Sequence, residues 1–307
     1  MYYPSGLFRR KALAALKGHW QAALLVALIV NLPTLLMQGF SAFTGNDPFS
    51  RLEAYIITAS RDGVLTQEAL LGEIQALLSS TGFWTVRGLE VLAWLVTPCL
   101  TLGMYKWVLN RLQGQEDPVT TVFCRVRLFF KAIGLQLLII LKILLWMLPG
   151  IAAGIITLLP VFRAAANYQG QAEALTQALQ GSYAMSLPVM LLMIIPGVMA
   201  GLRYALAEYI LAEEPSSKIL FCIRRSKYLM MGQKKNLFTL LVSFLLWYLL
   251  SVLVSSMLSG VFSLLVQMLA SLALSVYMAG SVGAFYQMLE KGKTPDAKNE
   301  PEQEELN

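Results

Sequence analysis

The chain has 307 residues, of which 57% are hydrophobic and only 14% charged, and its mean hydropathy is +0.61. Soluble globular domains carry about 25% charged residues, so this composition argues against a soluble enzyme or binding domain. The formal net charge is +6. Because the basic residues lie beside apolar runs, anionic lipid headgroups explain this charge better than nucleic acid does.

The apolar runs are long enough to cross a bilayer, and they predict an all-α fold, a polytopic transmembrane helical bundle of about six spans with interfacial amphipathic helices. We expect spans at about 20–39, 89–109, 132–159, 187–211, 237–258 and 262–289. Together they form a single integral membrane domain over 1–291. The polar, acidic residues 292–307 are expected to be a disordered tail.

The charges between the spans alternate in sign. Residues 1–19 are basic, residues 40–90 hold three basic and six acidic side chains, residues 106–131 hold five and two, and residues 203–236 hold seven and three. With six spans, every strongly basic segment falls on one side of the membrane. The positive-inside rule makes that side the cytoplasm, so both termini are expected there and the long loop 40–88 outside.

Amphipathic segments lie between the spans and are expected at the membrane interface. Two begin in the outer loop, at Pro48 and Thr66, a third begins at Pro118, and a fourth begins at Pro215 with Glu214 as its cap. In the fourth, one face is formed by Ile219, Cys222, Ile223, Ser226 and Met230. Its basic residues, predicted to contact anionic headgroups, are Lys218, Arg224, Arg225 and Lys227. The alternative is that these charges serve topology alone.

Two apolar segments repeat one another. LLWMLPGIAAG at 144–154 and LLMIIPGVMAG at 191–201 agree at six of eleven positions. Their Pro149-Gly150 and Pro196-Gly197 pairs are candidate helix breaks, because paired broken helices meet at the substrate site of many transporters. The alternative, which we favour, is two kinked helices that pack closely through glycine.

Three ionisable residues lie within or near the spans. Lys142 is inside the third span, and Arg203 and Glu208 lie near the inner end of the fourth. An ionisable residue at membrane depth is a functional hypothesis by default, so the three form a candidate polar intramembrane site. The simpler interpretation is structural pairing, or a lysine that extends toward water along the helix.

No catalytic constellation is present in the sequence. His19 is the only histidine, the three cysteines are scattered, and there is no HExxH, GxSxG or phosphate-binding loop. We therefore expect no catalytic residues, no metal site and no cofactor.

The sequence around the fourth and fifth spans resembles an uncharacterised bacterial family of polytopic membrane proteins, the domain of unknown function 975. The matching residues are Ile195-Pro196-Gly197, Arg203-Tyr204, Ile210-Leu211-Ala212, Pro215, Arg225-Ser226-Lys227, Met230-Met231-Gly232, Leu237-Phe238, Ser243-Phe244 and Trp247, with Ala15 to Trp20, Thr101-Leu102-Gly103 and Ala284-Phe285-Tyr286 elsewhere. The loop 40–88 and the linker 160–186 depart from the family pattern. The resemblance implies a bacterial cytoplasmic-membrane protein and no particular activity. A fainter similarity, to the membrane domain that accompanies some glycerophosphodiester phosphodiesterases, implies association with lipid.

These observations favour a non-enzymatic structural or accessory protein that contacts lipid. Another membrane protein or a second copy of the chain is a further candidate partner. The alternatives are a transporter or carrier of lipid or small solutes built on the Pro-Gly breaks, and an intramembrane enzyme that uses Lys142 or Glu208. A carrier requires a polar cavity at mid-depth, whereas a structural protein requires a packed, dry bundle.

The lipid-contact hypothesis predicts the effect of changing both Arg224 and Arg225 to Gln. Loss of two positive charges should weaken association with anionic lipid, because each base near the surface contributes about 1 kcal/mol. Sedimentation with anionic and neutral vesicles would measure the change. Equal binding of the variant and the wild type would leave these charges a role in topology only.

Overall fold

The computed structural model describes residues 5–44, 52, 54, 55, 57, 58, 67–166 and 172–293, and within these ranges it contains helices and no strand. The helices are α1 (Ser5–Leu16), α2 (Trp20–Thr44), α4 (Gln67–Ser79), α5 (Thr81–Leu112), the 3₁₀ helix η1 (Val119–Leu128), α6 (Phe129–Ala166), α7 (Ala172–Tyr204), α8 (Ala207–Glu213), α9 (Ile219–Leu229), α10 (Lys234–Ser256) and α11 (Gly260–Lys293).

The all-α prediction is confirmed. Six segments of the described chain are long and apolar enough to cross a membrane: Trp20–Met37, Thr81–Leu112, Val119–Pro160, Pro188–Glu213, Lys234–Ser256 and Phe262–Gly292. Each overlaps one predicted span. Large hydrophobic side chains along these helices are exposed, among them Leu145, Ile156, Leu192, Leu246 and Leu264. Exposed apolar side chains of this density fit helices whose solvent is lipid.

Several helices extend beyond the predicted spans. The second span helix, α5, begins at Thr81 instead of residue 89, because the Ser80 hydroxyl accepts a hydrogen bond from the Phe83 amide and caps the helix. Two of the charges counted in residues 40–90, Arg87 and Glu90, lie within α5 and form an ion pair of 2.8 Å. A paired charge one turn apart is compatible with a continuing helix.

The remainder of the loop 40–88 is partly helical. The helix expected from Thr66 is present as α4, whereas the one expected from Pro48 lies almost entirely outside the described residues. The predicted linker 160–186 is also mostly helix, since α6 runs to Ala166 and α7 begins at Ala172. The predicted tail lies outside the described residues from position 294 onward.

The amphipathic helix predicted from Pro118 is a 3₁₀ helix, η1, because it packs against the backbone of α5. A Cβ atom at Gly103 of α5 would collide with the carbonyl group of Val122. The buried side chain of Val122 anchors η1 in this position. Only glycine allows the two backbones to approach so closely.

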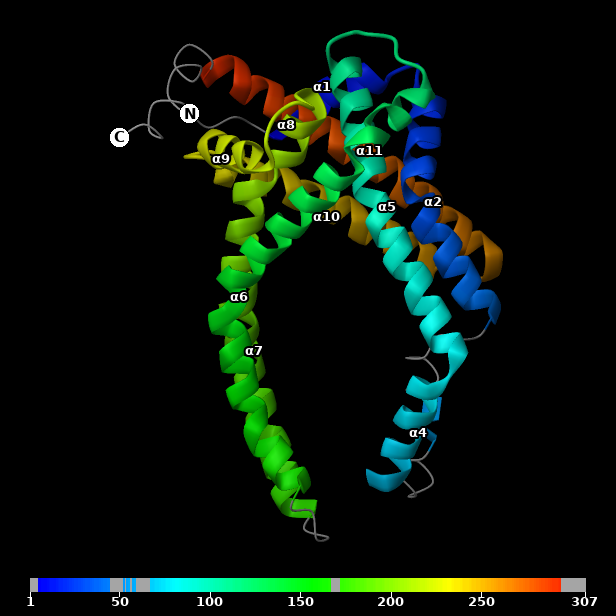
Figure 1. The fold of residues 1–307 in the computed structure, drawn as a ribbon, viewed down its shortest axis with the longest axis vertical. Coiled ribbons are helices and arrows are strands. Elements are labelled where there is room, and N and C mark those ends of the chain that lie inside the picture. The colour runs from blue at the N-terminus through cyan, green and yellow to red at the C-terminus, as the bar shows by residue number, and fades with distance from the viewer. Residues whose placement is uncertain are drawn as a thin grey trace.

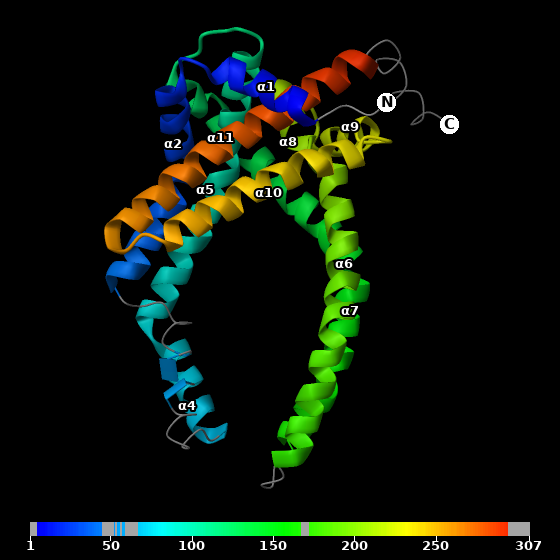
Figure 2. The ribbon, with the colours of Figure 1, turned by 180° about the vertical axis from the view of Figure 1, so that it is seen from behind.

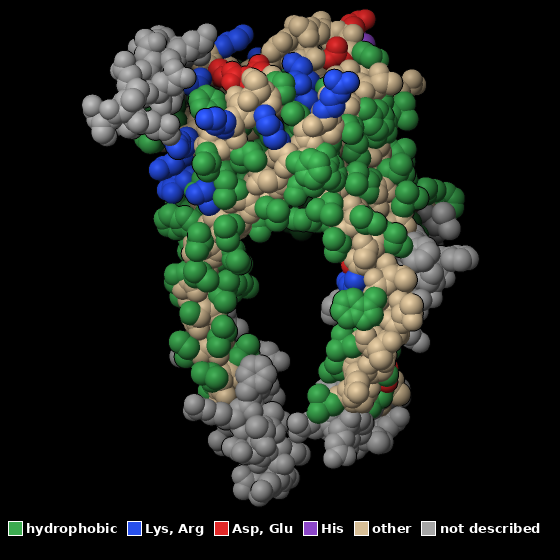
Figure 3. Space-filling model, viewed as in Figure 1, with side chains coloured by type: hydrophobic (Ala, Val, Ile, Leu, Met, Phe, Trp, Pro, Cys, Tyr) green, Lys and Arg blue, Asp and Glu red, His purple; other side chains and the backbone are tan. Residues whose placement is uncertain are grey.

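The helices are arranged as a head from which two arms extend (Figures 1 and 2). The head contains α1, η1, α8, α9 and the ends of α5, α10 and α11 that pack with them. The first arm is the α6–α7 hairpin. The second arm is α2 and α5, with α4 at its far end, and the α10–α11 hairpin packs against it through α11. We call the open space between the arms the arch; it passes through the molecule. In Figure 3 hydrophobic side chains line most of both of its sides, with basic and acidic side chains at the edge of the arm on the right.

The core of the molecule sits in the head. Phe8 of α1 packs edge-on against Phe285 of α11, with ring centroids 5.2 Å apart. Trp107 and Tyr286 are also fully buried there. Phe8 and Phe285 join the first described helix of the chain to the last. The head therefore gathers the N-terminal helix, the C-terminal end of α11 and the basic helix α9 at one end of the molecule (Figure 1).

Helices α6 and α7 are continuous through Pro149 and Pro196, so neither Pro-Gly pair breaks its helix. The glycines instead bring the two helices together. A Cβ atom at Gly150 would lie 2.5 Å from the Cα of Met193, and one at Gly197 would lie 3.1 Å from the Met147 side chain. The two repeated segments thus pack against one another in a nearly reciprocal, antiparallel way, which is the close packing that small residues permit in membranes.

Replacement of Gly150 by Ala should destabilise the hairpin. The added methyl group has no space beside Met193, and overpacking of this kind costs about 1–3 kcal/mol. Thermal unfolding of the purified protein in detergent would measure the loss. Gly201→Ala in α7 is the matched control, because nothing lies within 4 Å of a Cβ atom there. Equal stability of the two variants would contradict packing through Gly150.

Candidate functional site at the base of the arch

The fourth span is interrupted at Ala205 and Leu206, where the sequence contains neither proline nor glycine. Ser226 of α9 explains this break. Its hydroxyl donates to the Arg203 carbonyl at 3.0 Å and accepts from the Leu206 amide at 3.2 Å. Ser226 is completely buried. A side chain from α9 therefore pairs backbone groups that a continuous helix would pair internally, and α8 can leave the axis of α7.

Two basic residues hold the end of α8 and the chain that follows it. The guanidinium group of Arg125 donates to the Ala212 carbonyl at 2.6 Å, and the Lys131 ammonium group donates to the Pro215 carbonyl at 3.0 Å. These cations come from η1 and α6. They stabilise the carbonyl end of α8, where the last carbonyl groups lack intrahelical partners.

A hollow of about 220 Å³ lies where α5, α6 and α8 meet. Its walls are Trp94, Thr97, Pro98 and Thr101 of α5, Gln136 of α6 and Glu208 of α8. Of the predicted intramembrane residues, only Glu208 lines this hollow. We take the hollow as the candidate site, because it is a concave space with several convergent polar groups.

Aromatic contacts fix the position of Glu208. Tyr105 is a side-chain hydrogen-bond partner of Glu208, and its ring stacks on that of Tyr209 with centroids 4.1 Å apart. The Tyr209 hydroxyl donates to the Ala279 carbonyl of α11 at 2.9 Å. Helix α8 is thereby attached to α5 on one side and to α11 on the other, and Glu208 is held toward the hollow.

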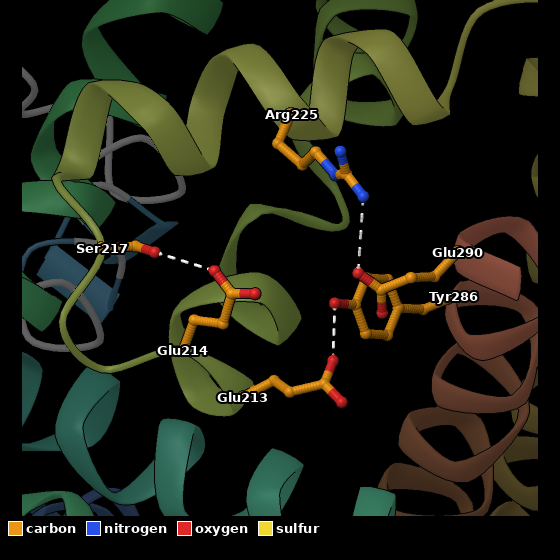
Figure 4. A network of polar contacts seen from close by, with 6 residues as sticks. All are labelled: Glu213, Glu214, Ser217, Arg225, Tyr286 and Glu290. Atoms are coloured by element: carbon orange, nitrogen blue, oxygen red, sulfur yellow. Dashed lines mark hydrogen bonds and ion pairs between the residues drawn. The ribbon is translucent and has the colours of Figure 1, made fainter. Parts of the chain in front are cut away.

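A second polar network lies on the other side of α8 (Figure 4). The Tyr286 hydroxyl donates to Glu213 at 2.7 Å, and Arg225 lies 3.7 Å from Glu290. These contacts join α8, α9 and α11. Glu214, predicted as the cap of the basic helix, instead ends α8 and accepts from the Ser217 hydroxyl at 3.0 Å. Helix α9 begins only at Ile219 and has no side-chain cap.

The four basic residues predicted for headgroup contact, of which Lys218 precedes α9 and three lie within it, do not share one environment. Lys218, Arg224 and Lys227 are exposed, whereas the side chain of Arg225 is only 16% exposed and is turned toward Glu290. Arg225 therefore differs from the other three as a candidate for headgroup contact. In Figure 3, the visible Lys and Arg side chains gather mainly over the head.

The apolar face of α9 buries Cys222, Ile223 and Ser226. Burial raises the pKa of the Cys222 thiol to about 11. This thiol stays protonated at neutral pH and is a packing group, since the thiolate is the reactive form.

Lys142 and Arg203 lie apart from the hollow. The guanidinium group of Arg203 stands over the ring of Trp146, 5.1 Å from its centroid. Lys142, one turn before Trp146 on α6, is half-buried, and it makes no hydrogen bond or ion pair within the described part of the chain. The predicted trio is therefore divided between the hollow, which holds Glu208, and the α6–α7 hairpin.

The uncharged residues of the site were not among the predicted ones. Thr97 and Thr101 are one turn apart on α5, and Gln136 is the only amide side chain within the predicted third span. Their signal in the sequence is a polar side chain within an apolar span, which is weaker than the signal of a charged side chain.

The described residues contain no group of three or more His, Cys, Asp or Glu side chains that could hold a metal ion. The sequence model of the family described as "Protein of unknown function (DUF975)" matches residues 1–293. The chain belongs to the DUF975 family. Among curated proteins and among solved structures, nothing matches this DUF975 chain.

Ser226→Ala tests the geometry at the break of the fourth span in this DUF975 protein. Without the hydroxyl, the buried Leu206 amide and Arg203 carbonyl lose a partner, which costs about 1–3 kcal/mol. Thermal unfolding in detergent should show the loss. Ser216→Ala serves as the control, because Ser216 is exposed and only its carbonyl group is contacted, by Lys131. Unchanged stability of Ser226→Ala would show that the break does not depend on this hydroxyl.

Proposed function

We propose that this DUF975 protein is a non-enzymatic, multi-pass protein of the bacterial cytoplasmic membrane that holds lipid in the arch between its arms. The arch itself is the observation that carries the proposal. Six apolar helices do not close into a dry bundle along their whole length (Figures 1 and 3). A space with apolar walls at the depth of the spans is filled by acyl chains in a bilayer.

Polar side chains gather where the two arms join the head, and a lipid headgroup would lie there. The hollow formed by α5, α6 and α8 presents Thr97, Thr101, Gln136 and Glu208. Apolar walls with a few convergent polar groups are the usual construction of a small-molecule site. An amphipathic lipid matches both parts at once, its acyl chains in the arch and its headgroup toward the hollow.

The distribution of charge supports a cytoplasmic head. The basic helix α9, the helix α1 with Arg9, Arg10 and Lys11, and the C-terminal end of α11 all lie at this end of the molecule (Figure 1). The positive-inside rule then directs the head to the cytoplasm and the far ends of the arms outward. The exposed bases Lys218, Arg224 and Lys227 would contact anionic headgroups of the inner leaflet.

The geometry gives less support to the carrier alternative. That alternative rested on helices broken at Pro149 and Pro196, and both helices are continuous there. Unwound backbone of the kind that binds substrates and ions in transporters does not occur at either Pro-Gly pair.

Lipid retention tests the proposal. The full chain, purified in mild detergent, should keep lipid through washing steps that remove annular lipid, and native mass spectrometry would count the bound molecules. Thr97→Phe should reduce that number, because the ring would fill part of a hollow of about 220 Å³.

The control for lipid retention is Leu246→Phe on α10, where the side chain is 66% exposed and away from the hollow. It should retain as much lipid as the wild type. A wild-type protein that retains no lipid, or a Thr97→Phe variant that retains all of it, would contradict the proposal.

A further inference from the structure

The hydrogen-bonding capacity of the hollow indicates which headgroup it would take. We propose that the hollow binds the primary ammonium group of a lipid headgroup, with Glu208 as its counter-ion. This inference rests on the proposed function and names the chemical class of the lipid. Three features support it: the acceptors in the hollow, the lack of a basic partner for Glu208 among the described residues, and the apolar surroundings of the hollow.

The two threonine hydroxyls have already used their hydrogens. The Thr97 hydroxyl donates to the Ala93 carbonyl at 2.7 Å, and the Thr101 hydroxyl donates to the Thr97 carbonyl at 2.9 Å. Each hydroxyl has one hydrogen and two lone pairs. Toward the hollow, both therefore act only as acceptors.

The other polar groups of the hollow add further acceptors. In its ionised form the carboxyl group of Glu208 accepts hydrogen bonds only, and Gln136 has a carbonyl oxygen beside its amide nitrogen. Trp94 adds an aromatic ring at the wall, whose face attracts cations. An acceptor-rich hollow with one negative charge complements a group with one positive charge and several N–H donors. A primary ammonium group has three such donors.

No basic side chain of the described protein neutralises Glu208. No ion pair of Glu208 occurs among residues 5–44, 67–166 and 172–293, and Tyr105 is its side-chain hydrogen-bond partner. Lys142 is six residues from Gln136, so the two side chains are about 120° apart around α6. Arg203 stands over Trp146. A carboxylate at membrane depth that has no internal counter-ion is costly, and a bound cation would offset that cost.

Two bases that contact the end of α8 and the chain after it are engaged there. Arg125 donates to the Ala212 carbonyl and Lys131 to the Pro215 carbonyl. The negative charge of Glu208 is therefore available to a ligand.

The setting of the hollow favours a lipid over a soluble amine as the source of the ammonium group. The residues that line the hollow on α5 and α6 have exposed, apolar neighbours in the same spans. These neighbours include Val91, Leu92 and Leu137. A soluble amine would have to reach the hollow through apolar surroundings. A lipid headgroup arrives with its acyl chains already in the arch.

Competition between two lipids of equal acyl chains tests the inference. The full chain is placed in nanodiscs with equal amounts of phosphatidylethanolamine and phosphatidylcholine, and the retained lipids are identified by native mass spectrometry. Both headgroups carry a positive nitrogen, but only ethanolamine has N–H donors. We expect a preference for phosphatidylethanolamine of at least about tenfold, since hydrogen bonds to charged groups contribute that much.

Three variants distinguish loss of the Glu208 charge from loss of folding. Glu208→Gln should abolish the preference, whereas Glu214→Gln, on the exposed end of α8, should keep it. Thr101→Val removes one acceptor at nearly the same volume and should lower the preference. It also provides the test should Glu208→Gln fail to fold, as judged by its thermal unfolding.

Any result other than a preference for phosphatidylethanolamine that depends on Glu208 and Thr101 overturns the inference. Equal retention of both lipids by the wild type, or an unchanged preference in Glu208→Gln and Thr101→Val, would exclude recognition of the ammonium hydrogens. Displacement of lipid by free ethanolamine at concentrations equal to that of the headgroup would assign the hollow to a soluble amine. Lipid retained without headgroup preference would leave the proposed function intact and refute only this inference, whereas loss of all lipid would refute both.

Discussion

The arrangement of the head depends on one buried hydroxyl group. Ser226 of α9 pairs the Arg203 carbonyl and the Leu206 amide, at the point where α7 ends and α8 departs. A break in a span leaves backbone groups that lipid cannot satisfy, so it requires a partner from elsewhere in the chain. Because Ser226 supplies that partner, α8 can turn into the head, where Tyr209 meets Tyr105 and Ala279. The position of Glu208 beside α5 and α6 follows from this turn.

The six spans could be predicted because crossing hydrocarbon imposes length and hydropathy on a helix whatever its neighbours are. Their ends could not, since an end depends on a local contact such as the Ser80 cap or the Arg87–Glu90 pair. The break between α7 and α8 was also hidden. Proline and glycine mark breaks in sequence, yet the helix continues at Pro196 and stops at Tyr204, for a reason located 22 residues further on at Ser226. The buried face of α9 was visible from its spacing. The inward turn of Arg225 was not, because its partner Glu290 lies in another helix.

The charged residue of the candidate site could be predicted from the sequence, but the hollow that it lines could not. Glu208 stood out because an acid near the end of a span is rare. Structural pairing was the simpler interpretation of this residue. Only the assembly of α5, α6 and α8 places Glu208 in a hollow with Thr97 and Gln136. Threonine within a span usually donates to its own helix, as Thr97 and Thr101 do. The remaining lone pairs of such a hydroxyl indicate a site only when a neighbouring helix places a charged group beside them.

The length of the long helices has a consequence for the surface of the protein away from the head. Helix α6 has 38 residues and α5 has 32, which correspond to about 57 and 48 Å of helix. The hydrocarbon core is only about 30 Å thick, and about 40–45 Å with its headgroup layers. Each arm therefore contains a helix that is longer than the hydrocarbon core is thick, so away from the head such a helix crosses the core at a tilt or continues into the headgroup layer.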